Sequence, residues 1–147
     1  MIVTLTVHGT PAPQGSKIRT RYGMREASAL VQPWREAIVS EVLRLGLQDT
    51  GMDGPLSVRV TFHHKRLESH YGTRLRQRYL KPSAPTYVAT TPDLDKVQRS
   101  TFDGLTQSGV IRDDKFIVVI HAQQIYSDST FTGADITIAT IGDSDDA

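Results

Sequence analysis

Alternating apolar and polar residues predict three strands in this chain. The alternation runs through residues 2–8, 56–63 and 134–139, where every second side chain is apolar. Successive side chains of a strand point to opposite faces of a sheet. Each of these segments should therefore cover a core with one face and meet solvent with the other.

A fourth strand is predicted at residues 116–126, but its pattern is different. Apolar residues occupy both of its faces: Phe116, Val118, Ile120 and Ala122 on one, and Ile117, Val119 and Ile125 on the other. Such a pattern is typical of a central strand that is covered on both sides. We expect helices to cover one face of this strand and a partner subunit to cover the other.

Two further segments carry residues at the spacing of an α-helix. The first should begin near Pro33 and end at Gly46, with an apolar stripe formed by Val31, Trp34, Ile38, Val42 and Leu45. Trp34 should lie in the core, whereas Arg35 and Glu36 should face solvent. The second helix spans residues 96–107 and ends before Gly109, with Leu94, Val97, Thr101 and Leu105 at helical spacing.

The order of these elements predicts a two-layer α+β fold, in which a mixed four-stranded sheet carries two helices on one face. A length of 147 residues fits a single domain with its own core. We place this domain at residues 1–142, followed by an acidic tail at residues 143–147. Residues 64–90 form a basic and polar excursion, and the sequence allows a helical turn near residues 73–80 within it.

The composition excludes several kinds of site and location. The chain has no cysteine, which rules out disulfides, thiolate zinc sites and a cysteine nucleophile. No apolar run is long enough to span a membrane, and the N-terminus lacks the pattern of a signal peptide, so we expect a cytoplasmic protein. His63 and His64 are adjacent in a predicted strand and should point apart, which makes a shared zinc ion the weaker interpretation.

Basic residues are concentrated in two stretches, although the net charge is only +1. Ten of the seventeen lie there: Lys17, Arg19, Arg21 and Arg25 in the first, and Lys65, Arg66, Arg74, Arg76, Arg78 and Lys81 in the second. Such charge is often only a solvated loop, but beside carboxylates suited to a metal it favours contact with phosphates. The predicted DNA-binding residues are Lys17, Arg19, Arg21, Arg74, Arg76 and Arg78.

Four aspartates around the second helix form the most informative pattern. Asp93 and Asp95 stand two apart, so in an extended chain both carboxylates face the same way. The helix would be roughly 18 Å long, and residues 108–114 could reach back by roughly 25 Å. Asp113 and Asp114 can therefore return to the first turn of the helix. Since neighbouring strand residues face opposite ways, one of that pair should join the site.

Carboxylates that meet at one point repel each other unless they are protonated or neutralised by a cation. Mg²⁺ prefers oxygen ligands and is usually held by a few carboxylates and waters, which makes it the predicted ion. Two simpler interpretations remain open. Asp93 or Asp95 could cap the helix, and Asp113 with Asp114 could form a turn before a strand.

The run PDLDKVQRSTFDGLTQSGVIRDD at residues 92–114 resembles the signature of the RusA-like Holliday junction resolvases of bacteriophages and prophages. Asp93 and Asp95 match the Asp-x-Asp of that family, and Asp114 matches its late catalytic aspartate. The sequence departs from the pattern at three positions: Arg99 stands where the family has an essential lysine, Lys96 replaces an asparagine, and Gly104 replaces an alanine. The last change should weaken the helix by about 1 kcal/mol.

The resemblance implies a Mg²⁺-dependent endonuclease, with Mn²⁺ as a possible substitute, that acts as a homodimer in the cytosol of a bacterium or of a phage-infected host. It would resolve Holliday junctions or related branched DNA by paired phosphodiester cleavage. Asp93, Asp95 and Asp114 would hold one or two metal ions, and Lys96 or Arg99 would stabilise the charge that develops at the phosphate. Asp103 should be structural. The loop after the first strand is either a plain connection or an arm that touches DNA.

Two alternatives of other classes are a non-catalytic DNA-binding module on the same fold and a metal-dependent phosphohydrolase of a small substrate. The second is disfavoured, because a nucleotide does not require ten cations.

Overall fold

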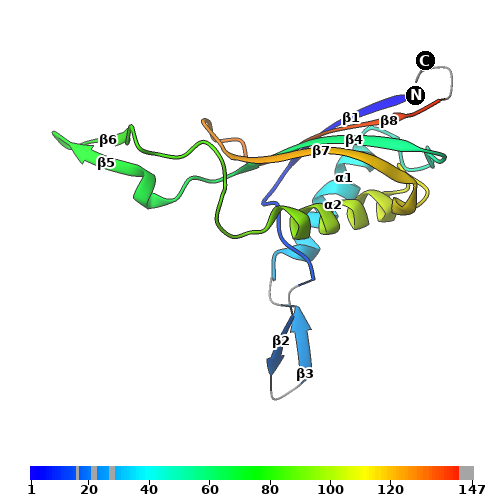
Figure 1. Cartoon of the computed structure of the whole chain (residues 1–147), viewed down its shortest axis with the longest axis horizontal. Coiled ribbons are helices and arrows are strands. Elements are labelled where there is room, and N and C mark those ends of the chain that lie inside the picture. The colour runs from blue at the N-terminus through cyan, green and yellow to red at the C-terminus, as the bar shows by residue number, and fades with distance from the viewer. Residues whose placement is uncertain (16, 21–22, 27–28, 143–147) are drawn as a thin grey trace.

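The computed structural model of this chain describes residues 1–15, 17–20, 23–26 and 29–142, with only the backbone described in the two short segments between residues 17 and 26. Four strands form the main sheet in the order β1-β8-β4-β7 (Figure 1). They are β1 (Ile2–His8), β4 (Leu56–His64), β7 (Ile117–Tyr126) and β8 (Gly133–Thr140). β8 pairs antiparallel with both β1 and β4, whereas β7 pairs parallel with β4, so the sheet is mixed as predicted.

Helices α1 (Val31–Arg44) and α2 (Leu94–Ser108) lie on the same face of this sheet (Figure 1), which confirms the predicted two-layer α+β fold. The predicted stripe of α1 is buried at four positions, Val31, Trp34, Ile38 and Val42. The prediction was wrong for Leu45, which is 41% exposed because α1 already ends at Arg44. Pro33 is the third residue of α1 and not its first.

The two helices pack closely at a glycine. A Cβ atom at Gly104 of α2 would lie 2.8 Å from the Cδ1 atom of Ile38 on α1. Next to this contact, the buried Trp34 indole donates a hydrogen bond of 3.0 Å to the Thr101 hydroxyl. Gly104 therefore allows the helices to approach, although glycine is a poor helix former.

β7 is an edge strand, which corrects the prediction of a central one. The last strand of the chain, β8, inserts between β1 and β4 and leaves β4 as the only strand paired with β7 among the described residues. Three apolar side chains of β7 are consequently exposed: Val118 by 61%, Val119 by 39% and Ile120 by 43%.

Two short hairpins project from this body (Figure 1). The first consists of β2 (Lys17–Thr20) and β3 (Gly23–Glu26), and the second of β5 (Tyr71–Arg74) and β6 (Gln77–Leu80). The helical turn expected near residues 73–80 was therefore wrong. The acidic tail predicted at residues 143–147 lies outside the described residues.

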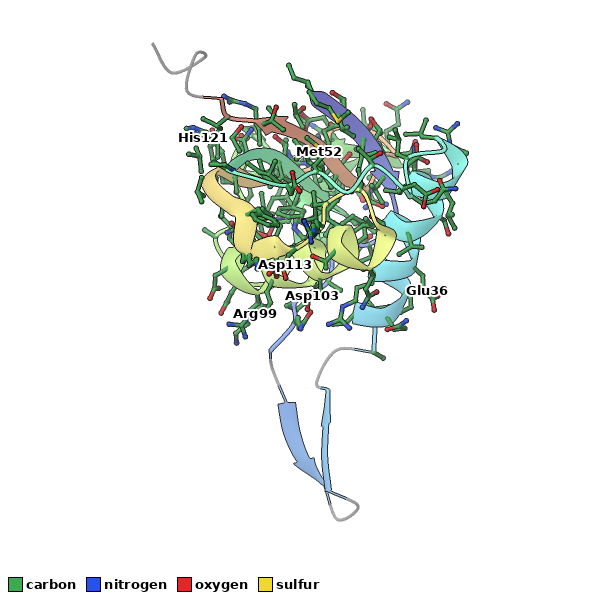
Figure 2. All side chains as sticks on the ribbon, turned by 90° about the vertical axis from the view of Figure 1, so that its right-hand side faces the viewer. Glu36, Met52, Arg99, Asp103, Asp113 and His121 are labelled. Atoms are coloured by element: carbon green, nitrogen blue, oxygen red, sulfur yellow. The ribbon has the colours of Figure 1, made fainter. Side chains whose placement is uncertain are left out.

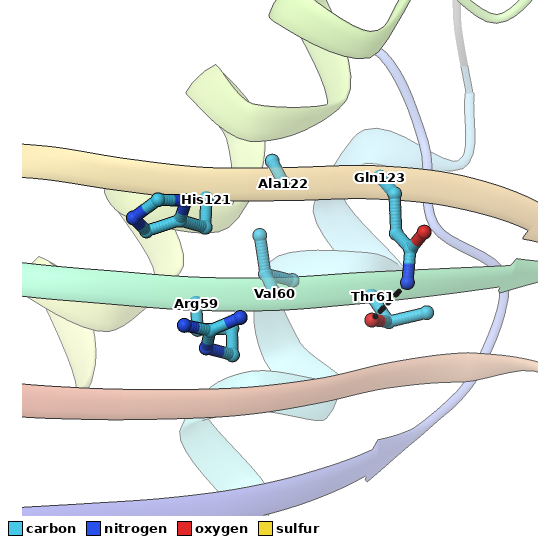
Figure 3. Close-up of a pocket in the computed structure, with 6 residues that line it drawn as sticks. All are labelled: Arg59, Val60, Thr61, His121, Ala122 and Gln123. Carbon is cyan, nitrogen blue, oxygen red and sulfur yellow. Dashed lines mark hydrogen bonds between the residues drawn. The ribbon is translucent and has the colours of Figure 1, made fainter.

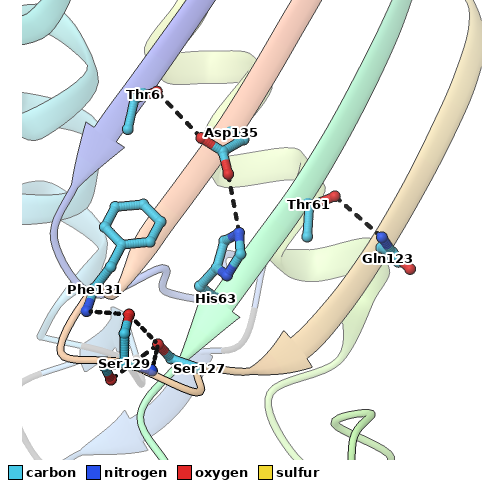
Figure 4. Close-up of polar contacts among 8 residues, drawn as sticks. All are labelled: Thr6, Thr61, His63, Gln123, Ser127, Ser129, Phe131 and Asp135. Atoms are coloured by element: carbon cyan, nitrogen blue, oxygen red, sulfur yellow. Dashed lines mark hydrogen bonds and ion pairs between the residues drawn. The ribbon is translucent and has the colours of Figure 1, made fainter.

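The sheet face opposite the helices is open and polar. Asp135 accepts a hydrogen bond of 3.1 Å from the Thr6 hydroxyl and lies 3.0 Å from Nε2 of His63 (Figure 4). Arg59 and His121 pair across β4 and β7 and line a shallow depression on these strands (Figure 3). His64 points the other way into the buried layer, so the two histidines do point apart as predicted.

None of the helices in the described part of the chain is both long and apolar enough to cross a membrane.

Candidate active site

The N-terminus of α2 places the first two aspartates of the predicted site. Asp93 occupies the N-cap position with extended backbone, but its side chain caps none of the amides in the described first turn. Its Oδ2 atom instead lies 3.8 Å from the Lys96 ammonium, and both side chains are partly exposed. The simpler interpretation, in which the Asp93 side chain caps the helix, is therefore wrong.

One face of α2 forms the wall of a shallow depression of about 280 Å³. Asp95, Gln98, Arg99 and Phe102 line it, at the spacing that puts helical residues on one side. The opposite wall is Asp114, at the start of the short helix η2 (Asp114–Phe116). The chain thus returns after α2 as predicted and brings Asp114 to the same depression as Asp95.

Asp93 does not line this depression. The expectation that Asp93 and Asp95 face one way assumed an extended chain, but α2 begins at Leu94 and Asp95 is already helical. Helical residues two apart do not face each other. Among the residues that the structure describes, no group of three or more acidic or histidine side chains is placed to hold a metal ion. The predicted convergence of three carboxylates is therefore reduced to two.

The neighbouring aspartates have different tasks. The Asp113 carboxylate accepts a hydrogen bond of 2.9 Å from the Lys115 amide and so caps η2. Partial burial of the Asp114 carboxyl raises its pKa, and the negative charges of Asp103 and Asp113 raise it further. A carboxylate that is crowded in this way is stabilised by any cation that binds beside it.

Asp103, for which the sequence suggested a structural role, does not line the depression, but its charge acts on Asp114. Figure 2 shows the side of the molecule on which Asp103, Asp113 and Arg99 are labelled. The Oδ2 atom of Asp103 is 3.5 Å from the Arg35 guanidinium. Arg35 therefore faces α2, and the prediction that it faces solvent was wrong. Phe102 lines the depression, and Asp103 is the next residue of α2. Helical geometry therefore puts Asp103 at the border of the depression, which the sequence pattern could have indicated.

The donor set fits a hard divalent ion such as Mg²⁺. This ion usually retains several waters and binds to one or two carboxylates of the protein. Asp95 and Asp114 supply two carboxylates to one open depression.

The segment before β2 contacts α2 at both candidate cations, Arg99 and Lys96. Arg99 lines the depression and lies against Gly15, since a Cβ atom there would be 3.0 Å from the Arg99 Nη1 atom. The backbone N–H of Gln14 donates a hydrogen bond of 3.0 Å to the backbone carbonyl of Lys96. The segment that leads into the β2–β3 hairpin therefore runs along α2 next to the site.

Five of the six predicted DNA-binding residues lie on the two hairpins. Lys17 and Arg19 belong to β2, of which only the backbone is described, and Arg21 lies outside the described residues. Arg74 and Arg76 are exposed on the β5–β6 hairpin, whereas Arg78 pairs with Glu68 at 3.1 Å.

Comparison with known families gives one result. Residues 8–139 match the family described as endodeoxyribonuclease RusA. The matched region contains both helices, the four aspartates and the β5–β6 hairpin. A comparison with curated proteins found no match.

Proposed function

Because the chain belongs to the RusA endodeoxyribonuclease family, we propose that it is a metal-dependent nuclease that resolves Holliday junctions or related branched DNA. The family match supports cleavage of DNA, and the resemblance of residues 92–114 to the resolvase signature supports the branched substrate. The observation that carries the proposal is the meeting of Asp95 and Asp114, from two distant segments, in one open depression within the matched region.

Asp95 and Asp114 would hold Mg²⁺, or Mn²⁺ in its place, with Asp93 at the margin of the site. The bound ion would lower the pKa of a water molecule and neutralise charge on the attacked phosphate. Arg99 is the better candidate for the cation that binds the phosphate, since it lines the depression, whereas Lys96 lies near Asp93. A guanidinium can bind two phosphate oxygens at once, which orients the scissile group.

We further propose that the active form is a homodimer. Residues 86–88 hydrogen-bond to the end of the outer edge of β7, at Gln124 and Tyr126. The start of that edge carries the exposed Val118, Val119 and Ile120, and this supports a dimer because an exposed apolar edge invites pairing with another strand. A two-fold dimer would present two depressions to a substrate that itself has nearly two-fold symmetry.

The proposal is tested by incubating the protein with a synthetic four-way junction and with a linear duplex, in the presence of Mg²⁺, Mn²⁺ or a chelator. We expect paired cuts in the junction, little cutting of the duplex, and none with chelator. Asp95→Asn should abolish cutting and preserve junction binding. Asp49→Asn, which changes the charge equally at an exposed position that does not line the depression, should cut as the wild type does.

Three results would contradict parts of this proposal. Equal cutting of duplex and junction would remove the substrate preference and leave a nuclease. Tight binding without cutting by any metal would support the non-catalytic DNA-binding module. Normal cutting by Asp95→Asn would show that the depression on α2 is not the active site.

A further inference from the structure

The β5–β6 hairpin ends in an exposed leucine. Leu75 is 91% exposed, more than any other large apolar residue described in this chain. Leu75 and Arg76 both adopt positive φ values, 51° and 64°, and connect the two strands of the hairpin. This is the conformation of a type I′ turn, which is best formed by Asn-Gly. A leucine at this position stabilises neither the turn nor a core.

The surroundings of Leu75 are strongly basic. No acidic residue occurs between Glu68 and Asp93 in the sequence. Arg74 and Arg76 flank the leucine, and neither forms an ion pair with an acidic side chain in the part of the chain that the structure describes. Arg78 is different, because it pairs with Glu68 and lies over the Tyr71 ring at 3.9 Å. Two uncompensated arginines around an exposed leucine are suited to a polyanion that also offers an apolar surface.

The hairpin is held firmly at its base. The Lys81 amide and ammonium donate hydrogen bonds of 2.9 and 3.0 Å to the carbonyls of His70 and Ser69. His70 is buried, and its ring packs edge-on against Tyr126 of β7 at 4.5 Å. Figure 1 shows the hairpin projecting beyond the sheet from this anchor. A projection that is ordered before binding loses little freedom when it inserts into a partner.

An exposed aromatic ring lies on one face of the hairpin. Tyr79 lies directly over Gly72, since a Cβ atom at Gly72 would be 2.7 Å from the tyrosine ring, and the tyrosine remains 44% exposed. Tyr79 and Leu75 line one shallow hollow together with Arg74. Bases stack on exposed aromatic rings, and leucine side chains are among those that proteins insert between base steps.

We propose that the β5–β6 hairpin is a wedge that enters branched DNA, with Leu75 against the base pairs at the branch point and Arg74 and Arg76 on the flanking phosphates. This inference rests on the proposed function and adds the element that recognises the branch. Insertion between base pairs requires their unstacking, which costs least where pairing is already interrupted. A branch point meets this condition and a continuous duplex does not, so the wedge favours the branched substrate.

The test uses a four-way junction with 2-aminopurine next to the branch point, in the presence of chelator so that the DNA stays intact. Fluorescence of this base rises when it unstacks. The wild-type protein should cause a rise with the junction and none with a duplex of the same sequence. Leu75→Asn should abolish the rise while keeping the fold, because asparagine suits the turn better than leucine. Leu43→Ser, at an exposed leucine of α1, is the matched control and should behave as the wild type.

The arginines give a second measurement. Arg76→Gln should weaken junction binding and lower the slope of log affinity against log salt by about 1. An unchanged fluorescence on wild-type binding, or an unchanged rise with Leu75→Asn, would overturn the wedge even if the protein cuts junctions with Mg²⁺. A rise that depends on Leu75 in a protein that never cuts would keep the wedge and overturn the nuclease.

Discussion

The guanidinium of Arg35 on α1 lies 3.5 Å from the carboxylate of Asp103 on α2, at the border of the acidic depression. This ion pair joins the two helices, and both of its side chains are partly exposed. It balances one of the negative charges that raise the pKa of Asp114.

A double-mutant cycle should detect this ion pair. Arg35→Gln should reduce the free energy of unfolding, and the reduction should disappear when Asp103 is already asparagine. Partly exposed pairs couple by about 0.2 to 1 kcal/mol. Chemical denaturation of the wild type, both single variants and the double variant measures the coupling. Equal losses from Arg35→Gln in both backgrounds would mean that Arg35 acts by packing alone.

Replacement of Asp114 by asparagine should stabilise the protein at neutral pH when chelator is present. Its pKa is raised in the folded state, so the folded protein binds this proton more tightly than the unfolded chain does. The resulting stability is complete below the ordinary value of 3.8 and is lost as the pH rises through the raised pKa. Asparagine does not ionise, so the Asp114→Asn variant does not lose this stability as the pH rises. Thermal melting should therefore show a higher Tm for Asp114→Asn at neutral pH, with the difference shrinking in acid.

The adjacent aspartate gives the opposite result and serves as the control. Asp113→Ala removes the acceptor for the Lys115 amide and should destabilise the protein by about 1 kcal/mol. A lower Tm for Asp114→Asn would show that the carboxylate is balanced by a group other than a bound cation.

Acid should destabilise the fold partly through His64. Burial lowers the pKa of its imidazole below the ordinary value of 6.5, with a smaller opposing effect from Gln124 at 3.2 Å. The unfolded chain therefore takes up this proton first as the pH falls. Stability from His64 is complete above 6.5 and is lost as the pH falls through the lowered pKa. His64→Gln should flatten the dependence of Tm on pH between about 5 and about 7.

His121→Gln is the matched control for this experiment, because His121 is exposed on the open face of the sheet. It should keep the wild-type dependence. The same slope in all three proteins would contradict the role assigned to His64.

Gly109 should tolerate no side chain. It ends α2 with a φ of 84°, and a Cβ atom there would overlap the carbonyl oxygen of Gln48. Gly109→Ala should cost at least about 2 kcal/mol, because the strained backbone and the overlap add. Gly46→Ala has a similar φ of 70° but meets no atom within 4 Å, so it should cost only about 1 kcal/mol. Urea denaturation compares the two, and equal costs would show that the Gln48 carbonyl moves freely.

Local patterns in the sequence were enough for the four strands of the main sheet, both helices and the return of Asp114 toward α2. The position of β7 was not predictable, because an edge strand becomes an edge only when a later segment, β8, pairs elsewhere. Exposed apolar residues on β7 mimic the pattern of a central strand. The β5–β6 hairpin was missed for another reason: its turn is Leu-Arg and lacks the Asn-Gly signal.

The sequence predicted only part of the acidic site. The convergence of Asp95 with Asp114 followed from chain length alone. The orientation of Asp93 depended on the residue at which α2 begins, and helix boundaries are the least certain feature of a sequence pattern. Arg35 and Asp103 meet across two helices that are far apart in sequence, and no local pattern contains that information.

The parallel pairing of β4 with β7 has a consequence for how this architecture can diversify. Parallel neighbours need a connection that carries the chain back along the sheet, and α2 by itself supplies that return. The β5–β6 hairpin is surplus to the return, because it leaves and re-enters the connection before α2 begins. A change in the length or sequence of this hairpin would therefore leave Asp95 and Asp114 in place, because α2 and η2 position them.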